Sequence, residues 1–198
     1  MKKVMSLVMV LVCFVAMAGC GEMKESDFEP GKLVKEDFAL INTETGVKLT
    51  LGMTKKEIEK LIGKPTEEHS SHTVYDGGLD IIYRNGIMAS MGVYLTKVKP
   101  TYKTPRGIDQ NSAMNDVRKK YGNYIIDSDY TETEVVPGHL YIMNLKSGEI
   151  ISQTVNREFA NSSLPLESIA TICFNAAKDG DTIYSFTISD GEMYFNRE

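Results

Sequence analysis

Two histidines and two glutamates, all common metal ligands, stand close together in the sequence. They form the run Glu67-Glu68-His69-Ser70-Ser71-His72. Imidazole nitrogens and carboxylates at such spacing can bind zinc. The run follows a predicted helix end, where a solvated loop is the ordinary outcome. We therefore treat His69 and His72 as weak metal candidates, and we predict no metal site and no cofactor.

Nucleophilic catalysis needs Ser or Cys beside a base and an orienting group. The sequence contains no nucleophile elbow, P-loop, Rossmann glycine pattern or HExxH motif. Cys173 lies in a predicted strand, where we interpret it as a small residue on the less covered side of a sheet, not as an activated thiolate. We predict no catalytic residues and no enzymatic activity. A metal-dependent or hydrolytic enzyme is the last of our alternatives.

The N-terminus has the organisation of an export signal. Lys2 and Lys3 precede an apolar stretch, residues 4–18, that is shorter than the roughly 20 residues a helix needs to cross a bilayer. The run Met17-Ala18-Gly19-Cys20 resembles the lipobox of bacterial lipoproteins. There, a signal peptidase cuts before a cysteine that already carries diacylglycerol. The residue three before the cysteine is usually leucine, so Met17 departs from the pattern.

This resemblance implies a signal peptide over 1–19 and lipid on Cys20, which would hold the chain on the extracytoplasmic face of a bacterial cell membrane. An ordinary secretory signal with a chance cysteine is the alternative. Cleavage would remove two lysines and change the formal net charge from −5 to −7. A negative chain repels phosphate backbones, so we predict no nucleic-acid partner. Only Cys173 would remain free, which excludes an intramolecular disulfide.

The elements that would position these residues begin after a charged segment. Residues 20–36 contain Pro30-Gly31 and show no sustained period, so we expect a flexible tether. Alternating apolar residues then predict a hairpin from 38–42 and 47–51. A two-turn helix follows, in which Thr54 and Glu57 form a capping box and Gly63 ends the helix.

Further strands and a second helix complete the chain. Strand patterns cover 73–75, 79–84 and 88–95, with a type I′ turn at Asn85-Gly86. Residues 96–106 contain two prolines and predict a connection. Asn111 or Ser112 can cap a second short helix that Gly122 ends. An additional hairpin is predicted from 140–145 and 150–155.

The apolar spacing of the early strands recurs in the late ones. The matching sets are Leu79/Ile81/Tyr83 with Ala170/Ile172/Phe174, and Met88/Met91/Val93 with Ile183/Phe186/Ile188. The second set changes from a period of two to three inside the strand, which indicates a β-bulge. The same change in both halves indicates a tandem duplication. We predict repeat unit 1 over 37–99 and repeat unit 2, with the additional hairpin, over 100–198.

The helix region also resembles a known family. The run Leu51-Gly52-Met53-Thr54, with Glu57-Ile58 and Leu61-Ile62-Gly63-Lys64-Pro65, resembles the helix motif of the SmpA/OmlA and β-lactamase-inhibitor-protein-like repeat superfamily. The tandem form is similar to lipoproteins of Gram-positive bacteria, on the residues Arg106-Gly107-Ile108 and Lys119-Lys120-Tyr121-Gly122. The resemblance covers about residues 38–190. It implies a sheet that is presented to another protein, as in an inhibitor that grips a class A β-lactamase.

These patterns together predict an α+β fold. We expect two tandem repeats of a short helix on antiparallel strands, forming one curved sheet with one open face. Strand parity places on that face the candidate partner-binding residues Asp80, Ile82, Arg84, Tyr94 and Thr187, together with Cys173. Tyr and Arg are frequent in protein-binding hot spots. We therefore predict a lipid-anchored, non-catalytic module that binds a protein or cell-envelope partner. The alternatives are a simple solvated face and an accessory structural subunit of an envelope assembly complex.

Overall fold

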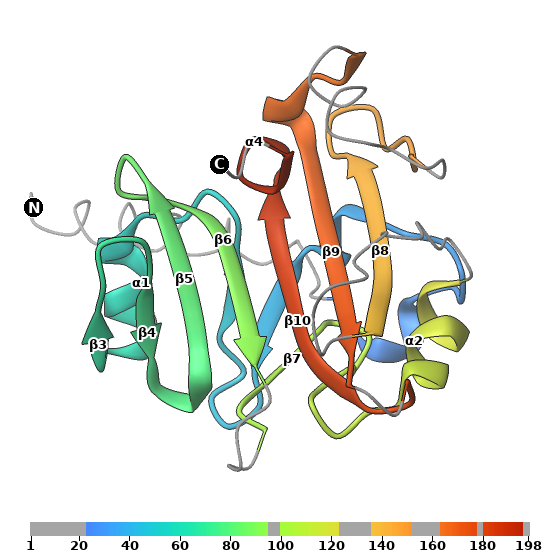
Figure 1. Ribbon diagram of the computed structural model, residues 1–198, viewed down its shortest axis with the longest axis horizontal. Helices are drawn as coiled ribbons and strands as arrows, with labels where there is room; N and C mark the ends of the chain where they lie inside the picture. Colours follow the sequence, from blue (N-terminus) through green and yellow to red (C-terminus); the bar gives the residue numbers. More distant parts are fainter. Residues whose placement is uncertain (1–22, 95–99, 123–135, 152–162, 178–179, 196–198) are drawn as a thin grey trace, which may run out of the picture.

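The computed structural model describes residues 23–94, 100–122, 136–151, 163–177 and 180–195. They form an α+β fold of mostly antiparallel strands with few helices, as the sequence predicted (Figure 1). The helices are α1 (Lys55–Ile62), α2 (Met114–Tyr121) and α4 (Gly191–Phe195). The 3-10 turns are η1 (Glu25–Asp27), η2 (Lys35–Asp37), η3 (Asp76–Gly78) and η4 (Leu166–Ser168).

The strands divide between two antiparallel sheets. The smaller sheet has the strand order β2-β1-β7, and the larger sheet has the order β3-β4-β5-β6-β10-β9-β8. The prediction of a single curved sheet is therefore corrected to two sheets. In the larger sheet β6 from the first half pairs with β10 from the second. The strands are β1 (Ala39–Asn42), β2 (Lys48–Thr50), β3 (Glu67–Glu68), β4 (Thr73–Tyr75), β5 (Leu79–Arg84), β6 (Ile87–Tyr94), β7 (Tyr102–Lys103), β8 (Val136–Asn144), β9 (Ile169–Ala176) and β10 (Ile183–Asp190).

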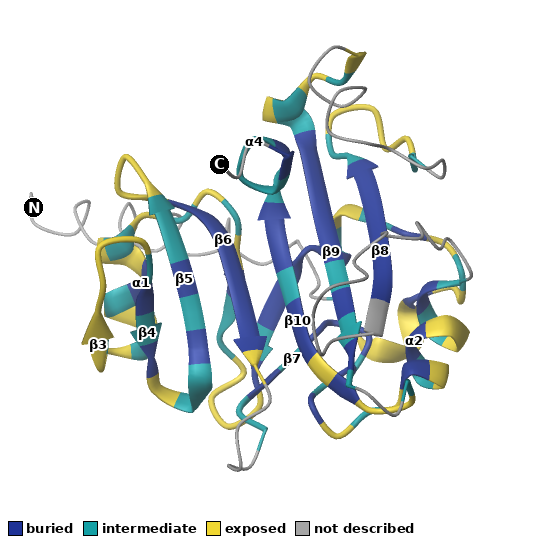
Figure 2. Cartoon of the chain, in the orientation of Figure 1, coloured by how far each residue is buried: buried dark blue, intermediate teal, exposed yellow. Residues whose placement is uncertain are grey.

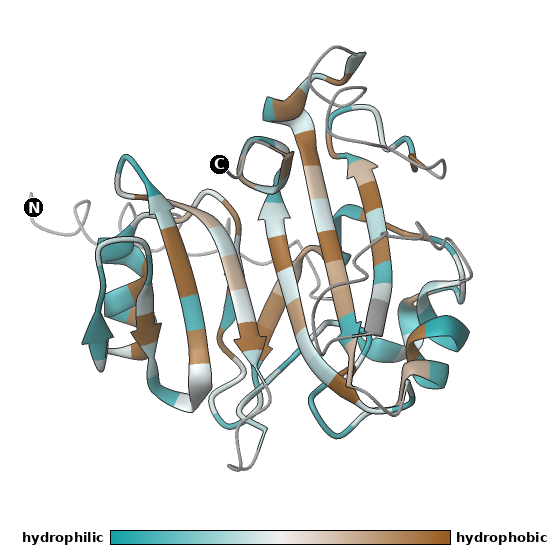
Figure 3. Cartoon of the chain, viewed as in Figure 1, coloured by the Kyte–Doolittle hydropathy of each residue, from teal (hydrophilic) through white to brown (hydrophobic). Residues whose placement is uncertain are grey.

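The main core lies between the larger sheet and a layer formed by the smaller sheet, α1 and α2. Met91, Phe174 and Ile188 of the larger sheet are fully buried in it, as are Ile58 of α1 and Val117 of α2. Figure 2 shows buried residues along most of β6, β9 and β10, whereas α2 carries exposed residues on its outer side. Apolar residues alternate with polar ones along β10 (Figure 3), which is the period of a strand with one covered face.

Helix α1 has both ends that the sequence predicted. The Thr54 hydroxyl oxygen accepts a hydrogen bond from the Glu57 backbone N–H at 3.3 Å, and a Glu57 carboxylate oxygen accepts one from the Thr54 N–H at 2.8 Å. This is the capping box, which satisfies donors that a helix start leaves open. Gly63 ends the helix with φ of 89°, a conformation that favours glycine.

Helix α2 begins one or two residues later than predicted. Its N-cap is Ala113, not Asn111 or Ser112, and the side chain of Ala113 cannot accept a hydrogen bond. Asp116 accepts a hydrogen bond from the Ala113 backbone N–H at 3.3 Å instead. A carboxylate in the first turn therefore replaces the predicted hydroxyl or amide cap.

Both longer helices are attached to the larger sheet in the same way. The Lys55 N–H donates to the Gly86 carbonyl at 3.1 Å, and the Met114 N–H donates to the Asp181 carbonyl at 2.8 Å. Each helix start also forms an isolated antiparallel bridge, Thr54 with Ile87 and Ala113 with Thr182. Each helix is therefore fixed at the turn that leads into β6 or β10.

The two bulges that the sequence predicted are present. In β6 the extra residue is Ala89, because its two neighbours pair with consecutive residues of β5. In β10 the extra residue is Tyr184, because its two neighbours pair with consecutive residues of β9. The predicted alignment of β5 with β9 is displaced, however. Leu79 pairs with Val93, and Ile172 pairs with Ile188, so an alignment of β6 with β10 on their bulges would match Ile172 to Leu79. A period of two cannot distinguish registers that differ by two residues.

The expected tether is part of the folded domain wherever it is described. Phe28 and Leu33 are buried, and two 3-10 turns lie within residues 23–37. This segment lacks a helix or strand period, so the sequence pattern resembled a linker. Phe28 and Leu33 nevertheless pack on the domain, which corrects the prediction for 23–36. Residues 20–22, including the lipid site at Cys20, lie outside the described residues.

The predicted connection and the additional hairpin are described in part. Within the connection, β7 pairs with β1 and completes the smaller sheet. The additional hairpin forms a bridge between Met143 and Ile150, and the Ile151 N–H donates to the Ile142 carbonyl at 2.9 Å. The remainder of its second arm, 152–155, lies outside the described residues.

Candidate functional site: the outer face of the larger sheet

Three predicted site residues lie in one row across the larger sheet, on the face opposite the main core. Asp80 pairs with Gly92, Gly92 with Thr187, and Thr187 with Cys173. Residues that pair in this way point to the same face of a sheet. Asp80, Thr187 and Cys173 are all half-buried. Cys173 therefore lies in the row of Asp80 and not in that of Ile82, and the predicted face is correct.

Tyr94 lies beside this row and is 42% exposed. A Cβ placed on Gly92 would lie 3.6 Å from Cε2 of the Tyr94 ring and 3.2 Å from the Thr187 hydroxyl oxygen. The ring therefore lies over Gly92, within van der Waals contact of the place where a Cβ would stand. The Gln110 side-chain amide donates to the Tyr94 carbonyl, which holds the backbone at the end of β6. We call Asp80, Gly92, Tyr94 and Thr187 the Tyr94 patch.

Arg84 does not join the Tyr94 patch. It lies at the end of β5 and donates to both Asp190 carboxylate oxygens, at 3.2 and 2.7 Å. A Glu192 carboxylate oxygen lies 3.2 Å from the same guanidinium. The hydrogen bond to Asp190 raises the pKa of Arg84 further above its ordinary value. The role of Arg84 is therefore to hold the start of α4, since Asp190 also accepts from the Met193 N–H at 2.7 Å.

Ile82 is half-buried and pairs with Ser90, one row away from the Tyr94 patch. The other residues of that row are polar, and their hydroxyl groups form hydrogen bonds with one another or with the backbone. The Ser90 and Ser189 hydroxyl oxygens lie 2.7 Å apart, and the Thr171 hydroxyl donates to the Ser189 carbonyl at 3.3 Å. All three polar residues are buried. Ile82 thus borders the Tyr94 patch but belongs to a different row.

The outer face is covered at its β8 end, which limits the predicted open face. Leu140 and Ile142 of β8 form a second, small core with Ile169 and Phe195. Phe195 belongs to α4, which lies against β9 and β10 (Figure 1). The sequence contained a signal for this cover. Residues 140–143 are apolar without alternation, which is typical of a strand that is buried on both faces.

The exposed His69 and the half-buried His72 lie together. Their ring centroids are 4.4 Å apart in a stacked arrangement. His69 Nε2 lies 3.2 Å from a Glu67 carboxylate oxygen, and His72 Nε2 lies 3.9 Å from an Asp80 oxygen. Within the described part of the chain, no three His, Cys, Asp or Glu side chains are grouped closely enough to hold a metal ion.

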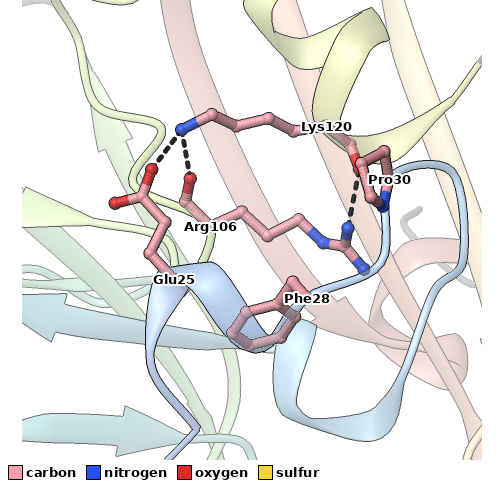
Figure 4. A pocket seen from close by; sticks show the side chains of 5 residues that line it. All are labelled: Glu25, Phe28, Pro30, Arg106 and Lys120. Atoms are coloured by element: carbon pink, nitrogen blue, oxygen red, sulfur yellow. Dashed lines mark hydrogen bonds and ion pairs between the residues drawn. The ribbon is translucent and has the colours of Figure 1, made fainter.

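We call residues 23–37 the N-terminal segment. A small pocket of about 190 Å³ lies between this segment and the residues before and in α2, and it is lined by Glu25, Phe28, Pro30, Arg106 and Lys120 (Figure 4). All five guanidinium donors of Arg106 are used. They bond to both Asp37 carboxylate oxygens and to the carbonyls of Glu29, Lys32 and Lys120. Lys120 Nζ donates to Glu25 at 2.5 Å and to the Arg106 carbonyl at 2.6 Å. Because Arg106 and Lys120 already bond to carboxylates and carbonyls of the chain, we interpret the pocket as part of the packing between the N-terminal segment and α2.

Sequence reasoning missed Gly92 and the covering role of α4. A glycine in the middle of a strand pattern indicates a close approach at that position, and this signal was available for Gly92. No comparable signal was available for α4, because its five residues are too few to show a helical period.

Comparison with family models, curated proteins and solved structures found no match to this chain. No helix among the described residues is long and apolar enough to cross a membrane.

Proposed function

We propose that this chain is an extracytoplasmic lipoprotein that binds a protein or cell-envelope partner through the Tyr94 patch. In this proposal residues 1–19 are a cleaved signal, and lipid on Cys20 holds the mature chain on the bacterial cell membrane. Binding at the membrane gains from the high local concentration that attachment gives. The chain carries out no catalysis, and neither a cofactor nor a nucleic acid takes part.

The observation that carries this proposal is the exposed ring of Tyr94 over Gly92. A partly exposed aromatic side chain can bury a large area when a partner binds. Asp80 and Thr187 add a carboxylate and a hydroxyl beside it, and these can fix the orientation of a partner. Such a mixture of aromatic and polar groups is typical of protein interfaces.

We also propose that the fold arose by tandem duplication. Support comes from the matched attachment of α1 and α2 and from the matched bulges at Ala89 and Tyr184. The β6–β10 pairing adds to it. Met91 pairs with Ile188 and Val93 pairs with Phe186, on either side of the Gly92–Thr187 pair. If Met91 corresponds to Phe186 and Val93 to Ile188, a local two-fold axis passes through that pair.

The test uses the lipidated chain on intact cells of its host, crosslinked and then captured. Tyr94→Ala and Asp80→Asn should each lose a partner that the unaltered chain captures, without lowering the melting temperature. Leu61→Ala is the matched control, because Leu61 is 44% exposed on α1, away from the outer face. Equal capture by all three variants would rule out the Tyr94 patch. Mass spectrometry of the mature N-terminus tests lipid on Cys20.

A further inference from the structure

The N-terminal segment lies on the side of the domain opposite the Tyr94 patch. A series of side-chain contacts shows this. The Phe174 ring, on the core face of β9, lies 5.0 Å from the Tyr121 ring of α2. The Arg106 guanidinium lies 5.0 Å from Tyr121 on one side and 5.0 Å from Phe28 on the other. Phe28 is thus separated from the larger sheet by α2 and Arg106, and in Figure 1 the N-terminal ribbon passes behind β8 and β9.

This segment is fixed close to its first described residue. The Gly31 N–H donates to the Lys120 carbonyl at 3.1 Å, and Glu25 pairs with Lys120 Nζ (Figure 4). Arg106 is 2% exposed and bonds two carbonyls of the segment as well as Asp37. Moving the segment away would take the Glu29 and Lys32 carbonyls from a buried guanidinium, and buried donors without acceptors are unfavourable. The chain therefore leaves the domain at a defined place.

Little chain separates that place from the proposed lipid site. Only Gly21 and Glu22 stand between Cys20 and Met23. At no more than about 3.6 Å for each residue, three steps span at most about 11 Å. A link this short cannot let the domain turn over. The side that carries the N-terminal segment must face the bilayer whenever lipid on Cys20 is inserted in it.

The charge of this side fits a membrane surface better than the rest of the chain does. Residues 24–37, Arg106 and α2 together carry seven basic and six acidic side chains. The other described residues together carry a formal net charge of −5. Among the described residues the acidic excess therefore lies away from the anchored side, which reduces repulsion by anionic lipid headgroups.

We propose that the side formed by the N-terminal segment and α2 rests on an anionic phospholipid bilayer, so that the Tyr94 patch points away from the membrane. This orientation rests on the proposed lipid anchor. It also selects the partner class, since the patch would be presented to molecules in the cell wall or the surrounding medium and not to the lipid surface.

The experiment measures how close two positions lie to the bilayer. Full-length chain is produced in a bacterial host and reconstituted in vesicles of phosphatidylglycerol and phosphatidylethanolamine with a nitroxide on some headgroups. In a Cys173→Ser background, Tyr94→Cys and Lys119→Cys variants each carry one fluorophore. The Lys119 side chain is 67% exposed on α2, so both sites accept a label. We expect quenching at position 119 to be several-fold stronger than at 94.

A matched control removes the constraint without altering the domain. A Gly-Ser extension between Glu22 and Met23 should make quenching at the two positions similar. Equal quenching without the extension, or stronger quenching at 94, would overturn the orientation while leaving lipid attachment and partner binding intact. If mass spectrometry finds no lipid on Cys20, the anchored function and the orientation both fail.

Discussion

Arg106 and Asp37 are 69 residues apart in the sequence, and they form a buried ion pair in which Nε lies 2.6 Å from Oδ1. Their exposed fractions are 2% and 0%. The pair joins the N-terminal segment to the chain that leads into α2. Together with the bonds from Arg106 to the Glu29 and Lys32 carbonyls, this pair holds residues 23–36 on the domain.

Asp37→Ala should destabilise the protein strongly. It leaves the Arg106 guanidinium buried without its carboxylate, which typically costs about 3–5 kcal/mol. Urea denaturation followed by circular dichroism measures the loss. Glu29→Ala is the matched control, because the Glu29 carboxylate is 70% exposed in its pair with Lys32. An exposed pair contributes at most about 1 kcal/mol. Equal effects of the two variants would contradict a structural role for the buried pair.

The caps of the two helices should respond differently to substitution. Thr54→Ala removes the acceptor of the Glu57 N–H, and the loss of an N-cap typically costs about 1 kcal/mol. Asn111→Ala should change the free energy of unfolding by less than about 0.5 kcal/mol, because Asn111 is exposed and is not the N-cap of α2. Urea midpoints compare the two. A larger loss for Asn111→Ala would show that α2 starts earlier.

His139 should make stability depend on pH. The His139 Nε2 accepts a hydrogen bond from Arg118 at 2.8 Å, and burial, followed by the charge of Arg118, lowers the pKa of His139 below 6.5. On acidification the unfolded chain takes up this proton first, so the free energy of unfolding falls as pH drops below about 6.5. The fall ends once the pH is below the pKa in the folded state.

The measurement is urea denaturation between pH 7.5 and 5. His139→Gln keeps an acceptor for Arg118 but cannot be protonated, so its stability should fall less steeply than that of the unaltered chain. Leu61→Ala serves as the control, because Leu61 is exposed and carries no titratable group, and it should retain the full slope. Identical slopes for the unaltered chain and His139→Gln would contradict this account of His139.

Arg84→Glu should lower stability, and it is therefore a poor probe of partner binding. The new carboxylate would face Asp190 and Glu192 in place of a cation. Because Arg84 is 44% exposed, we expect a loss of about 1 kcal/mol. Limited proteolysis should show earlier cleavage near α4, whereas Arg84→Gln should have a smaller effect. Unchanged proteolysis in Arg84→Glu would mean that this ion pair does not hold α4.

Local patterns predicted the elements well where one face of an element is covered. The strands 73–75 and 79–84, the α1 caps and the bulges at Ala89 and Tyr184 all follow from period and turn chemistry. Relations between distant segments could not be predicted in this way. The third strand of the smaller sheet is β7, which pairs with β1, and its two residues are too few to carry a periodic signal.

The candidate site was predicted only in part for the same reason. Strand parity identified the face that carries Asp80, Tyr94 and Thr187, because parity is a local property. It could not show that Arg84 forms an ion pair with Asp190, which is 106 residues away in the sequence. Nor could it show that the N-terminal segment packs on Arg106, because an irregular segment with few apolar residues has the composition of a linker.

The central claim is that the Tyr94 patch binds a partner outside the cell membrane. Its most direct test is site-specific photocrosslinking on intact cells, with a photoreactive amino acid at position 94 or at position 61 of the full-length chain. We expect a discrete crosslinked species from position 94 and none from position 61, lost when Asp80→Asn is added. No species at position 94, or the same species from both positions, would contradict the claim.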